Sequence, residues 1–254
     1  MHRMYSNVIC VVWSGLKLYF SCHSTPHEAF MRTFLNNRAH LAHTLIICAR
    51  CALDIPRCSC IDGPAKSTVK LADIPQIVNR LLSAHYSHIS HLHDAIASGS
   101  ILSTPLSWPY FQQRVKSTGS TVQPLSFVSS WDGVKLKGHS RQKCWPLGLM
   151  SLDLDDGHRA REGSVALAAI YFGDIEPSTA VYDRLLRYVV NELEGYRFWN
   201  GIEIDSKVVT AACDDPARRK IFGMRHHSSS GSCFYCFDTG TRVKLHPPGT
   251  TSWI

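Results

Sequence analysis

The sequence has no hydrophobic run of the length that a membrane-spanning helix requires, which is about 18 uncharged apolar residues. The best candidate, residues 8–20, is short and is interrupted by Lys17. This run could pass for the core of a secretory signal peptide, but no small-residue cleavage site is obvious after it, so we do not expect export. The sequence therefore predicts no membrane partner.

The chain also has fewer acidic than basic residues. The chain has 20 Asp and Glu against 27 Lys and Arg, which gives a formal net charge of +7. A basic surplus suits a polyanionic partner such as nucleic acid, and it equally suits plain solubility. With 44% hydrophobic and 19% charged residues, wholesale disorder is excluded, and 254 residues allow one domain with appendages or two small domains. Composition alone names no reaction.

Ten cysteines, several of them in close pairs, are the first chemical signal. Because no convincing export signal accompanies them, we expect reduced or metal-bound thiols rather than a disulfide framework. Cys48, Cys51, Cys58 and Cys60 could together hold one zinc ion, but the Cys58-x-Cys60 spacing is tighter than that of a usual ligand pair. We interpret this group as incidental.

Cys233 and Cys236 form a further pair, with the C-x2-C spacing that supplies half of a tetrahedral zinc site. The other half is not clear, since His226, His227 and His246 are the only nearby imidazoles. A redox role is less expected, because no strand is predicted ahead of the pair as a thioredoxin-type arrangement requires. Zinc is thus a cofactor that the sequence allows.

From about residue 71 the hydrophobic pattern becomes regular. Apolar residues at helical spacing predict a helix over residues 74–97. Its histidines, at positions 85, 88, 91 and 93, are spread over more than one face, so we expect them on a polar surface rather than around a metal. A linker rich in Ser, Pro and Gly follows at 99–109, and a short helix is expected over 110–116.

The second half of the chain has a clear order of elements. We predict strands over 125–131, 144–154 and 165–172, a helix from Pro177 to Gly195, a strand over 208–213 and a further helix from Pro216. This order predicts an α/β fold with an incomplete, ribonuclease-H-like mixed sheet and a helical N-terminal region. We divide the chain into a poorly readable region (1–65), a helical region with linker (66–120) and this partial core (121–254).

Two aspartates fall at the ends of predicted strands. Asp132 ends the first strand and Asp214 ends the fourth, and these strands are central neighbours in a ribonuclease-H-like sheet. Carboxylates held together there could bind two divalent cations, which activate a nucleophile and stabilise the leaving oxygen of a phosphodiester. Each aspartate also has an ordinary explanation, because Asp132 before Gly133 suits a turn and Asp214 before Pro216 suits a helix cap.

Several segments together resemble the transposases of CACTA/EnSpm-like (tnp2-type) DNA transposons, over about residues 71–249 and best from Asp132 onward. The segments that carry the resemblance are Trp131-Asp132-Gly133-Val134, Cys144-Trp145-Pro146-Leu147, Ile170-Tyr171-Phe172-Gly173, Asn191-Glu192-Leu193, Cys213-Asp214-Asp215-Pro216-Ala217-Arg218, Gly223, Ser228-Ser229 and Cys233-Phe234-Tyr235-Cys236. The ordered set is specific to that family, whereas no single segment is.

The resemblance implies a DDE nuclease core that uses Mg2+ or Mn2+ to cut and rejoin transposon ends. Asp132 would be the first acid and Asp214 the second, with Asp215 at a variable position. Cys233 and Cys236 would be half of a zinc-binding insertion within the core region. In the family the third acid follows this pair on a later helix, and the sequence stops before it. We therefore expect a truncated transposase-derived protein that is catalytically incompetent by itself.

The resemblance also implies DNA as a partner, a nuclear or otherwise cytoplasmic location, and compatibility with a homo-oligomer. Arg218, Arg219, Lys220 and Arg225 would contact the phosphate backbone, although a solvated helix face explains these residues as well. Two alternatives stay open. One is a non-catalytic nucleic-acid or protein-interaction module derived from a transposase, and the other is a small zinc-stabilised domain with no link to DNA.

Overall fold

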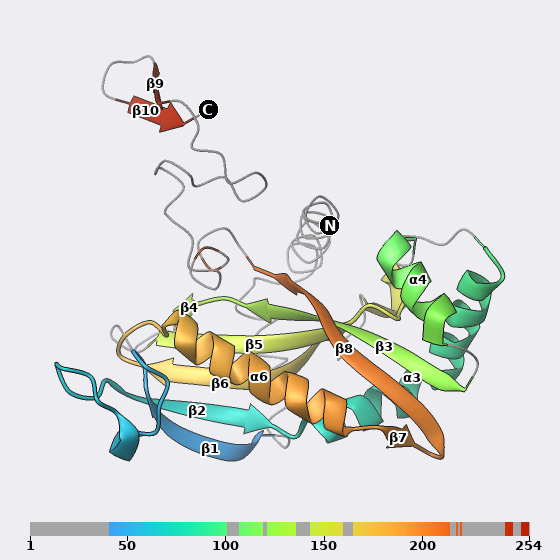
Figure 1. Cartoon of the computed structure of the whole chain (residues 1–254), viewed down its shortest axis with the longest axis horizontal. Coiled ribbons are helices and arrows are strands. Elements are labelled where there is room, and N and C mark those ends of the chain that lie inside the picture. Colours follow the sequence, from blue (N-terminus) through green and yellow to red (C-terminus); the bar gives the residue numbers. More distant parts are fainter. Residues whose placement is uncertain are drawn as a thin grey trace.

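The computed structural model describes residues 41–100, 107–118, 121–135, 143–159, 165–213, 217, 219, 242–245 and 250–253. Within these residues the strands are β1 (Leu41–Cys48), β2 (Lys66–Ala72), β3 (Val122–Trp131), β4 (Val134–Lys135), β5 (Lys143–Ser151), β6 (Val165–Gly173), β7 (Phe198–Trp199), β8 (Ile202–Ala212), β9 (Arg242–Leu245) and β10 (Thr250–Trp253). The helices are α3 (Ile74–Ala97), α4 (Pro109–Thr118), α5 (Asp156–Arg159) and α6 (Thr179–Gly195), with one 3-10 turn, η2 (Ile55–Arg57). The described part of the chain is therefore a mixed α/β structure (Figure 1).

Eight of the described strands form one mixed sheet. Its order is β1-β2-β6-β5-β3-β8-β7, and β4 pairs with β5 beside this path. Strands β3 and β8 run parallel, whereas the pairs β1–β2, β2–β6, β5–β6, β3–β5 and β7–β8 are antiparallel. Strands β9 and β10 form a separate antiparallel hairpin. The predicted mixed α/β class is confirmed.

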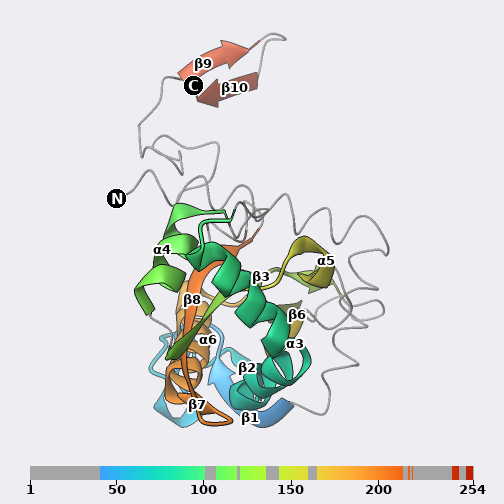
Figure 2. The same cartoon turned by 90° about the vertical axis from the view of Figure 1, so that its right-hand side faces the viewer.

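Helices cover both faces of the sheet at β3. Successive side chains of a strand point to opposite faces, and the side chains on the two faces of β3 join different apolar clusters. Leu125, Phe127 and Trp131 of β3 belong to the main apolar cluster, which also contains the buried stripe of α6 and the first half of α3. Val128 belongs to a second cluster with residues of α4 and of the end of α3. Figure 2 shows α3 and α4 next to each other, and the first half of α3 also packs with α6 in the main cluster.

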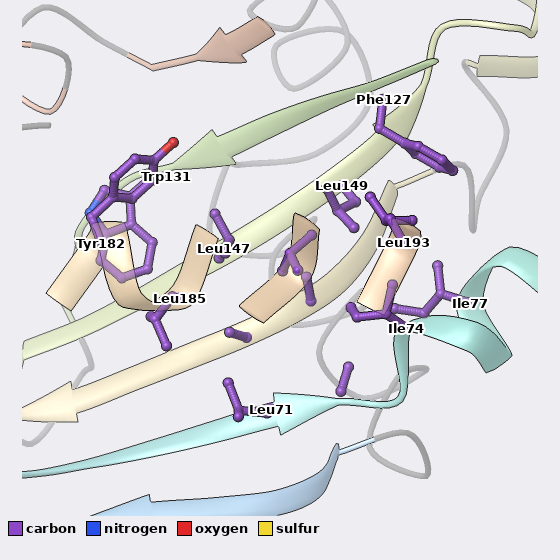
Figure 3. Close-up of a cluster of buried hydrophobic side chains, with 14 of the residues drawn as sticks. Leu71, Ile74, Ile77, Phe127, Trp131, Leu147, Leu149, Tyr182, Leu185 and Leu193 are labelled. Carbon is purple, nitrogen blue, oxygen red and sulfur yellow. The ribbon is translucent and has the colours of Figure 1, made fainter. Parts of the chain in front are cut away.

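The main cluster follows from the helical spacing that the sequence predicts. Val181, Leu185, Val189 and Leu193 recur every four residues along α6 and are all buried against the sheet. Figure 3 labels Leu185 and Leu193 of α6 together with Leu147 and Leu149 of β5, which all belong to this cluster. Removing these side chains from water supplies the main force that holds α6 on the sheet.

Helix α3 matches its predicted bounds at both ends. Asp73 caps it, with its Oδ1 accepting a hydrogen bond from the Gln76 amide at 3.0 Å. The predicted polar setting of its histidines is wrong at one position, because His93 is only 7% exposed. None of the helices in the described residues is both long and apolar enough to span a bilayer.

The sequence missed β1 and β2 at one edge of the sheet and β7 at the other. Strands β1 and β2 precede α3, where the chain was poorly readable and only a helical region was expected. Their signal is weak because β1 is an edge strand with exposed positions, such as Ile46 at 41%. The second predicted strand ends at Ser151 rather than residue 154, and the short helix α5 occupies part of the loop that was expected after it.

Strand β8 begins at Ile202, six residues before the predicted start at residue 208. It forms a hairpin with β7 around Asn200 and Gly201, whose φ angles are 49° and 81°. Positive φ at both central residues is the geometry for which Asn-Gly is favoured in tight hairpins. The Asn200-Gly201 dipeptide is therefore a sequence signal for the β7–β8 hairpin that our predictions did not use.

Candidate functional site

The strands that precede the two predicted acids are parallel neighbours in the structure. Ser130 of β3 lies opposite Ala212 of β8 in the register of this pair. Asp132 follows Ser130 by two residues, and Asp214 follows Ala212 by two residues. Asp132 is exposed, and its Oδ1 accepts a hydrogen bond from the Gly133 amide at 2.7 Å. Asp214 lies outside the described residues.

An aromatic cluster fixes the backbone that carries Asp132. Trp131 is 1% exposed, and its ring centroid lies 5.7 Å from that of Trp145 and 5.6 Å from that of Tyr182 (Figure 3 labels Trp131 and Tyr182). Burial raises the pKa of Tyr182 to about 12, so its hydroxyl stays protonated. At the residue after Asp132, a Cβ added to Gly133 would stand 2.8 Å from Trp145 Cζ2. The close contact leaves no space for a side chain at residue 133.

Most of the other predicted site residues lie outside the described part of the chain. Arg218, Lys220 and Arg225 of the basic segment are among them, and so are both cysteines of the predicted zinc half-site, Cys233 and Cys236. Arg219 is described as a helical, half-buried residue. The assignment of these residues to DNA or zinc stays a prediction.

A buried polar network joins α3 to the middle of the sheet. Asp153 is fully buried and accepts hydrogen bonds from the Ser126 amide at 2.6 Å and the Ser151 hydroxyl at 3.3 Å. His93 Nε2 lies 2.9 Å from Asp153 Oδ1, and Gln123 donates to His93 Nδ1 at 2.6 Å. Every member of this network has a partner, which is the pattern of a structural core rather than of a site awaiting a ligand.

A second histidine of α3 belongs to a possible metal-binding group. His88, Asp155 and His158 place one ligand atom each within 4.8 Å of one another. Asp155 Oδ2 lies 3.2 Å from His88 Nε2, and Asp155 Oδ1 lies 2.9 Å from His158 Nδ1. The imidazole rings of the two histidines stack with their centroids 3.7 Å apart. Two imidazoles and a carboxylate could coordinate a divalent transition metal.

The charge balance of this group also fits a simple ion-pair cluster. Burial and the neighbouring His158 lower the pKa of His88, while Asp155 acts in the opposite direction. Burial would raise the pKa of Asp155, but hydrogen bonds from the His158 amide and ring outweigh it and lower that pKa. Asp155 also caps α5 through the His158 amide at 2.8 Å. These contacts satisfy Asp155 and His158, but the buried Nε2 of His88, 3.2 Å from Asp155 Oδ2, makes no hydrogen bond within the described residues.

The four cysteines of residues 48–60 are brought together by the loop between β1 and β2. Their sulfur atoms all lie within 4.8 Å of one another. Cys48 Sγ is 3.8 Å from Cys60 Sγ, and Cys51 Sγ is 3.7 Å from Cys58 Sγ. Our interpretation of this group as incidental did not anticipate that geometry, because sequence spacing does not reveal how a loop folds back on itself.

Cys48 and Cys60 of this group differ in their tendency to ionise. Burial alone would raise the pKa of Cys48, but backbone amides of Cys51, residue 50 and residue 65 stabilise its thiolate and lower that pKa to about 6. Hydrogen bonds involving the Cys58 and Cys51 side chains raise the pKa of Cys60 to about 12. By contrast, burial alone raises the pKa of Cys144 to about 12, which makes it an ordinary buried thiol. The loop therefore favours a thiolate at Cys48 and a neutral thiol at Cys60.

Comparison with known proteins adds a family without an assigned activity. Residues 32–252 match the model of a family described as a protein of unknown function, DUF1258. No curated protein matches the chain.

Proposed function

We propose that this chain, which belongs to the DUF1258 family, is a transposase-derived protein of a DNA transposon. Since the function of the family is unknown, the proposal is argued from two aspartates of the chain and from the order of its strands. The proposal gives it a ribonuclease-H-like core in which Asp132 and Asp214 bind Mg2+ or Mn2+. It also assigns DNA, in particular transposon ends, as the partner and the nucleus as the location.

The observation that carries this proposal is the parallel pairing of β3 with β8. Parallel neighbours end at the same edge of a sheet, so residues that follow equivalent positions emerge close together. Asp132 and Asp214 each follow a paired residue, Ser130 and Ala212, by two positions. This register supports a shared site for the two carboxylates.

The order of strands gives independent support. Strands β6, β5, β3 and β8 are consecutive neighbours, and α6 connects β6 to β8. Numbered along the chain from β3, with the two-residue strands β4 and β7 left out, this is the order third, second, first, fourth, with the first and fourth parallel. A ribonuclease-H-like sheet has its first and fourth strands as central neighbours in this way. Strands β1 and β2 would extend such a sheet beyond β6.

The chemistry that follows is binding of divalent cations by oxygen ligands. Mg2+ accepts one or two carboxylates and keeps several waters, so a pair of aspartates is a sufficient protein contribution. Cleavage of a phosphodiester needs every acid and both ions in fixed geometry. Metal binding, rather than strand transfer, is therefore the property to measure on this chain.

The test is a titration of the purified chain with Mn2+, followed by the paramagnetic relaxation of water protons. We expect Asp132→Asn and Asp214→Asn each to weaken Mn2+ binding at least tenfold. Asp174→Asn, in an exposed loop after β6, is the matched control and should leave binding unchanged. Equal Mn2+ affinity in all three variants would contradict the proposed site.

The basic surplus favours a second candidate, a module derived from a transposase that binds nucleic acid without catalysis. Arg218, Arg219 and Lys220 follow the second acid by four to six residues. Each contact of such a side chain with a phosphate makes the affinity for DNA fall as the salt concentration rises. DNA binding that depends on salt but not on Mn2+, and that survives Asp132→Asn, would favour this candidate. Binding that needs both aspartates and the metal would favour the first.

A further inference from the structure

We propose that Cys48, Cys51, Cys58 and Cys60 bind one zinc ion in a closed tetrathiolate site that holds the β1–β2 loop in place. This site is separate from the two aspartates, and it does not depend on the proposed role in DNA transposition.

The first support is the spacing of the sulfur atoms. Four sulfurs placed about 2.3 Å from a central zinc in a tetrahedron lie about 3.8 Å from one another. The Cys48–Cys60 and Cys51–Cys58 sulfur pairs lie at 3.8 and 3.7 Å, and all four atoms fall within 4.8 Å. The sulfurs thus already stand close to the corners of a zinc–thiolate tetrahedron.

The same distances do not fit disulfides. A disulfide brings its two sulfurs to about 2.05 Å, whereas the closest pair here is 3.7 Å apart. All four cysteines are free thiols in the structure. Two disulfides, Cys48–Cys60 and Cys51–Cys58, are the competing chemistry that the experiment has to separate from zinc.

The backbone on each side of the cysteine pairs turns sharply to bring the sulfurs inward. Ala52 follows the second cysteine with a φ of 62°, a conformation that costs a non-glycine residue energy. Its amide donates to the Cys48 carbonyl at 2.8 Å. At the other pair, Gly63 has a φ of 74°, and its amide donates to the Cys60 carbonyl at 2.9 Å.

Apart from Ala49 and Ala52, the described side chains of the loop bury little apolar surface. Within η2 no residue is buried, Leu53 is 44% exposed, and Ile61 is fully exposed. An ion pair between Arg50 and Asp62 at 3.0 Å joins the two cysteine pairs, but both side chains are exposed, so it adds little. A segment that buries so little apolar surface is the kind that a structural metal stabilises.

The loop in turn contacts the start of α6, as Figure 1 shows. Arg184 of α6 donates to the Ala52 carbonyl and to Asp54 Oδ1, the latter at 2.9 Å. The Ser178 amide donates to the Ala49 carbonyl at 3.1 Å. Zinc at this position would therefore fix both the loop and the beginning of the helix that connects β6 to β8.

Four protein ligands leave no open position for water or substrate, so the role is structural rather than catalytic. The test measures zinc by elemental analysis in the chain carrying Cys233→Ser and Cys236→Ser, which removes any zinc held by that pair. We expect one zinc per chain in this background. Adding Cys51→Ser and Cys58→Ser should remove it, whereas adding His88→Gln and His158→Gln should not.

A second measurement does not rely on variants that could fail to fold. The background chain is stripped of metal under reducing conditions and titrated with Co2+, whose visible spectrum distinguishes four thiolates from mixed ligands. A four-thiolate spectrum that saturates at one Co2+ per chain is the expected result. No metal in the background chain, two disulfides by mass analysis, bound iron instead of zinc, or a spectrum of mixed nitrogen and sulfur ligands would each overturn the proposal.

Discussion

His93 Nε2 of α3 lies 2.9 Å from Oδ1 of the fully buried Asp153, which follows the end of β5 by two residues. Gln123 of β3 donates to the other ring nitrogen of His93, and the Ser126 amide donates to the other oxygen of Asp153. Two elements far apart in sequence are thus joined through polar groups inside an apolar core. Since an unpaired buried carboxylate is costly, each member depends on the others.

Replacing His93 with Ala should destabilise the fold strongly. The substitution leaves Asp153 buried without one of its donors, and breaking a buried pair in this way costs about 3 kcal/mol. Urea unfolding followed by circular dichroism measures the change. His91→Ala, at an exposed position of the same helix, is the control and should change the unfolding free energy by less than about 0.5 kcal/mol. Similar stability in both variants would show that the pair contributes nothing.

Gly133→Ala should disturb the segment that carries Asp132. The new methyl group would stand 2.8 Å from Trp145 Cζ2, so either the ring or the backbone must move. Overpacking of this kind costs about 1–3 kcal/mol. We expect a lower melting temperature together with weaker Mn2+ binding, because the shift occurs next to the proposed ligand.

Gly195→Ala is the matched control for that substitution. A Cβ at Gly195 meets nothing within 4 Å, so the melting temperature and Mn2+ affinity should stay close to those of the parent chain. If Gly133→Ala behaves in the same way as Gly195→Ala, the aromatic cluster does not hold the Asp132 segment in place.

The stability of the fold should depend on pH through His88. Burial, His158 and, more weakly, His91 lower its pKa below the usual 6.5, against the opposing effect of Asp155. Just below pH 6.5 the unfolded chain binds a proton at this residue more readily than the folded chain does. Stability must therefore fall as the pH drops through this range. The lowered pKa of Asp155 acts in the same direction, but only in more acidic solution.

His88→Gln should flatten this dependence, which melting temperatures between pH 7 and pH 5 can measure. His43→Gln, at an exposed position of β1, serves as the control and should keep the slope of the parent chain. An unchanged slope in His88→Gln would show that burial does not make His88 resist protonation.

Sequence patterns predicted the elements whose apolar residues repeat regularly. Helix α6 has its stripe at helical spacing, and β6 is a continuous apolar run, so both were found close to their true bounds. Strand β8 was found only in part, because Glu203, Asp205 and Lys207 alternate with less polar residues in its first half. Glu203 and Lys207 are exposed and Asp205 is half-buried, so this half of the strand lacks the continuous apolar run by which a buried strand is predicted.

The candidate sites were predicted less well than the fold, and for a physical reason. The strands before Asp132 and Asp214 were expected to be neighbours because a ribonuclease-H-like sheet pairs its first and fourth strands, and β3 and β8 are paired in the structure. The cysteine cluster depends instead on two tight turns, one at Ala52 and one at Gly63. Ala52 carries no sequence signal for a left-handed conformation, since glycine or asparagine is usual there.

Removing zinc should loosen the β1–β2 loop without unfolding the sheet. Arg57 is exposed in η2, and Arg50 lies in the turn between the first two cysteines, so trypsin reports directly on the order of this loop. We expect chelation to accelerate cleavage after both arginines several-fold, because the loop buries few apolar side chains that could hold it in place without the metal. Lys116 on α4, which packs on the opposite face of β3 from α6, is the control and should be cleaved at the same rate. Equal cleavage of the loop with and without chelator would mean that the turns and the Arg184 contacts order the loop without a metal. Faster cleavage at Lys116 as well would mean that the metal supports the whole sheet.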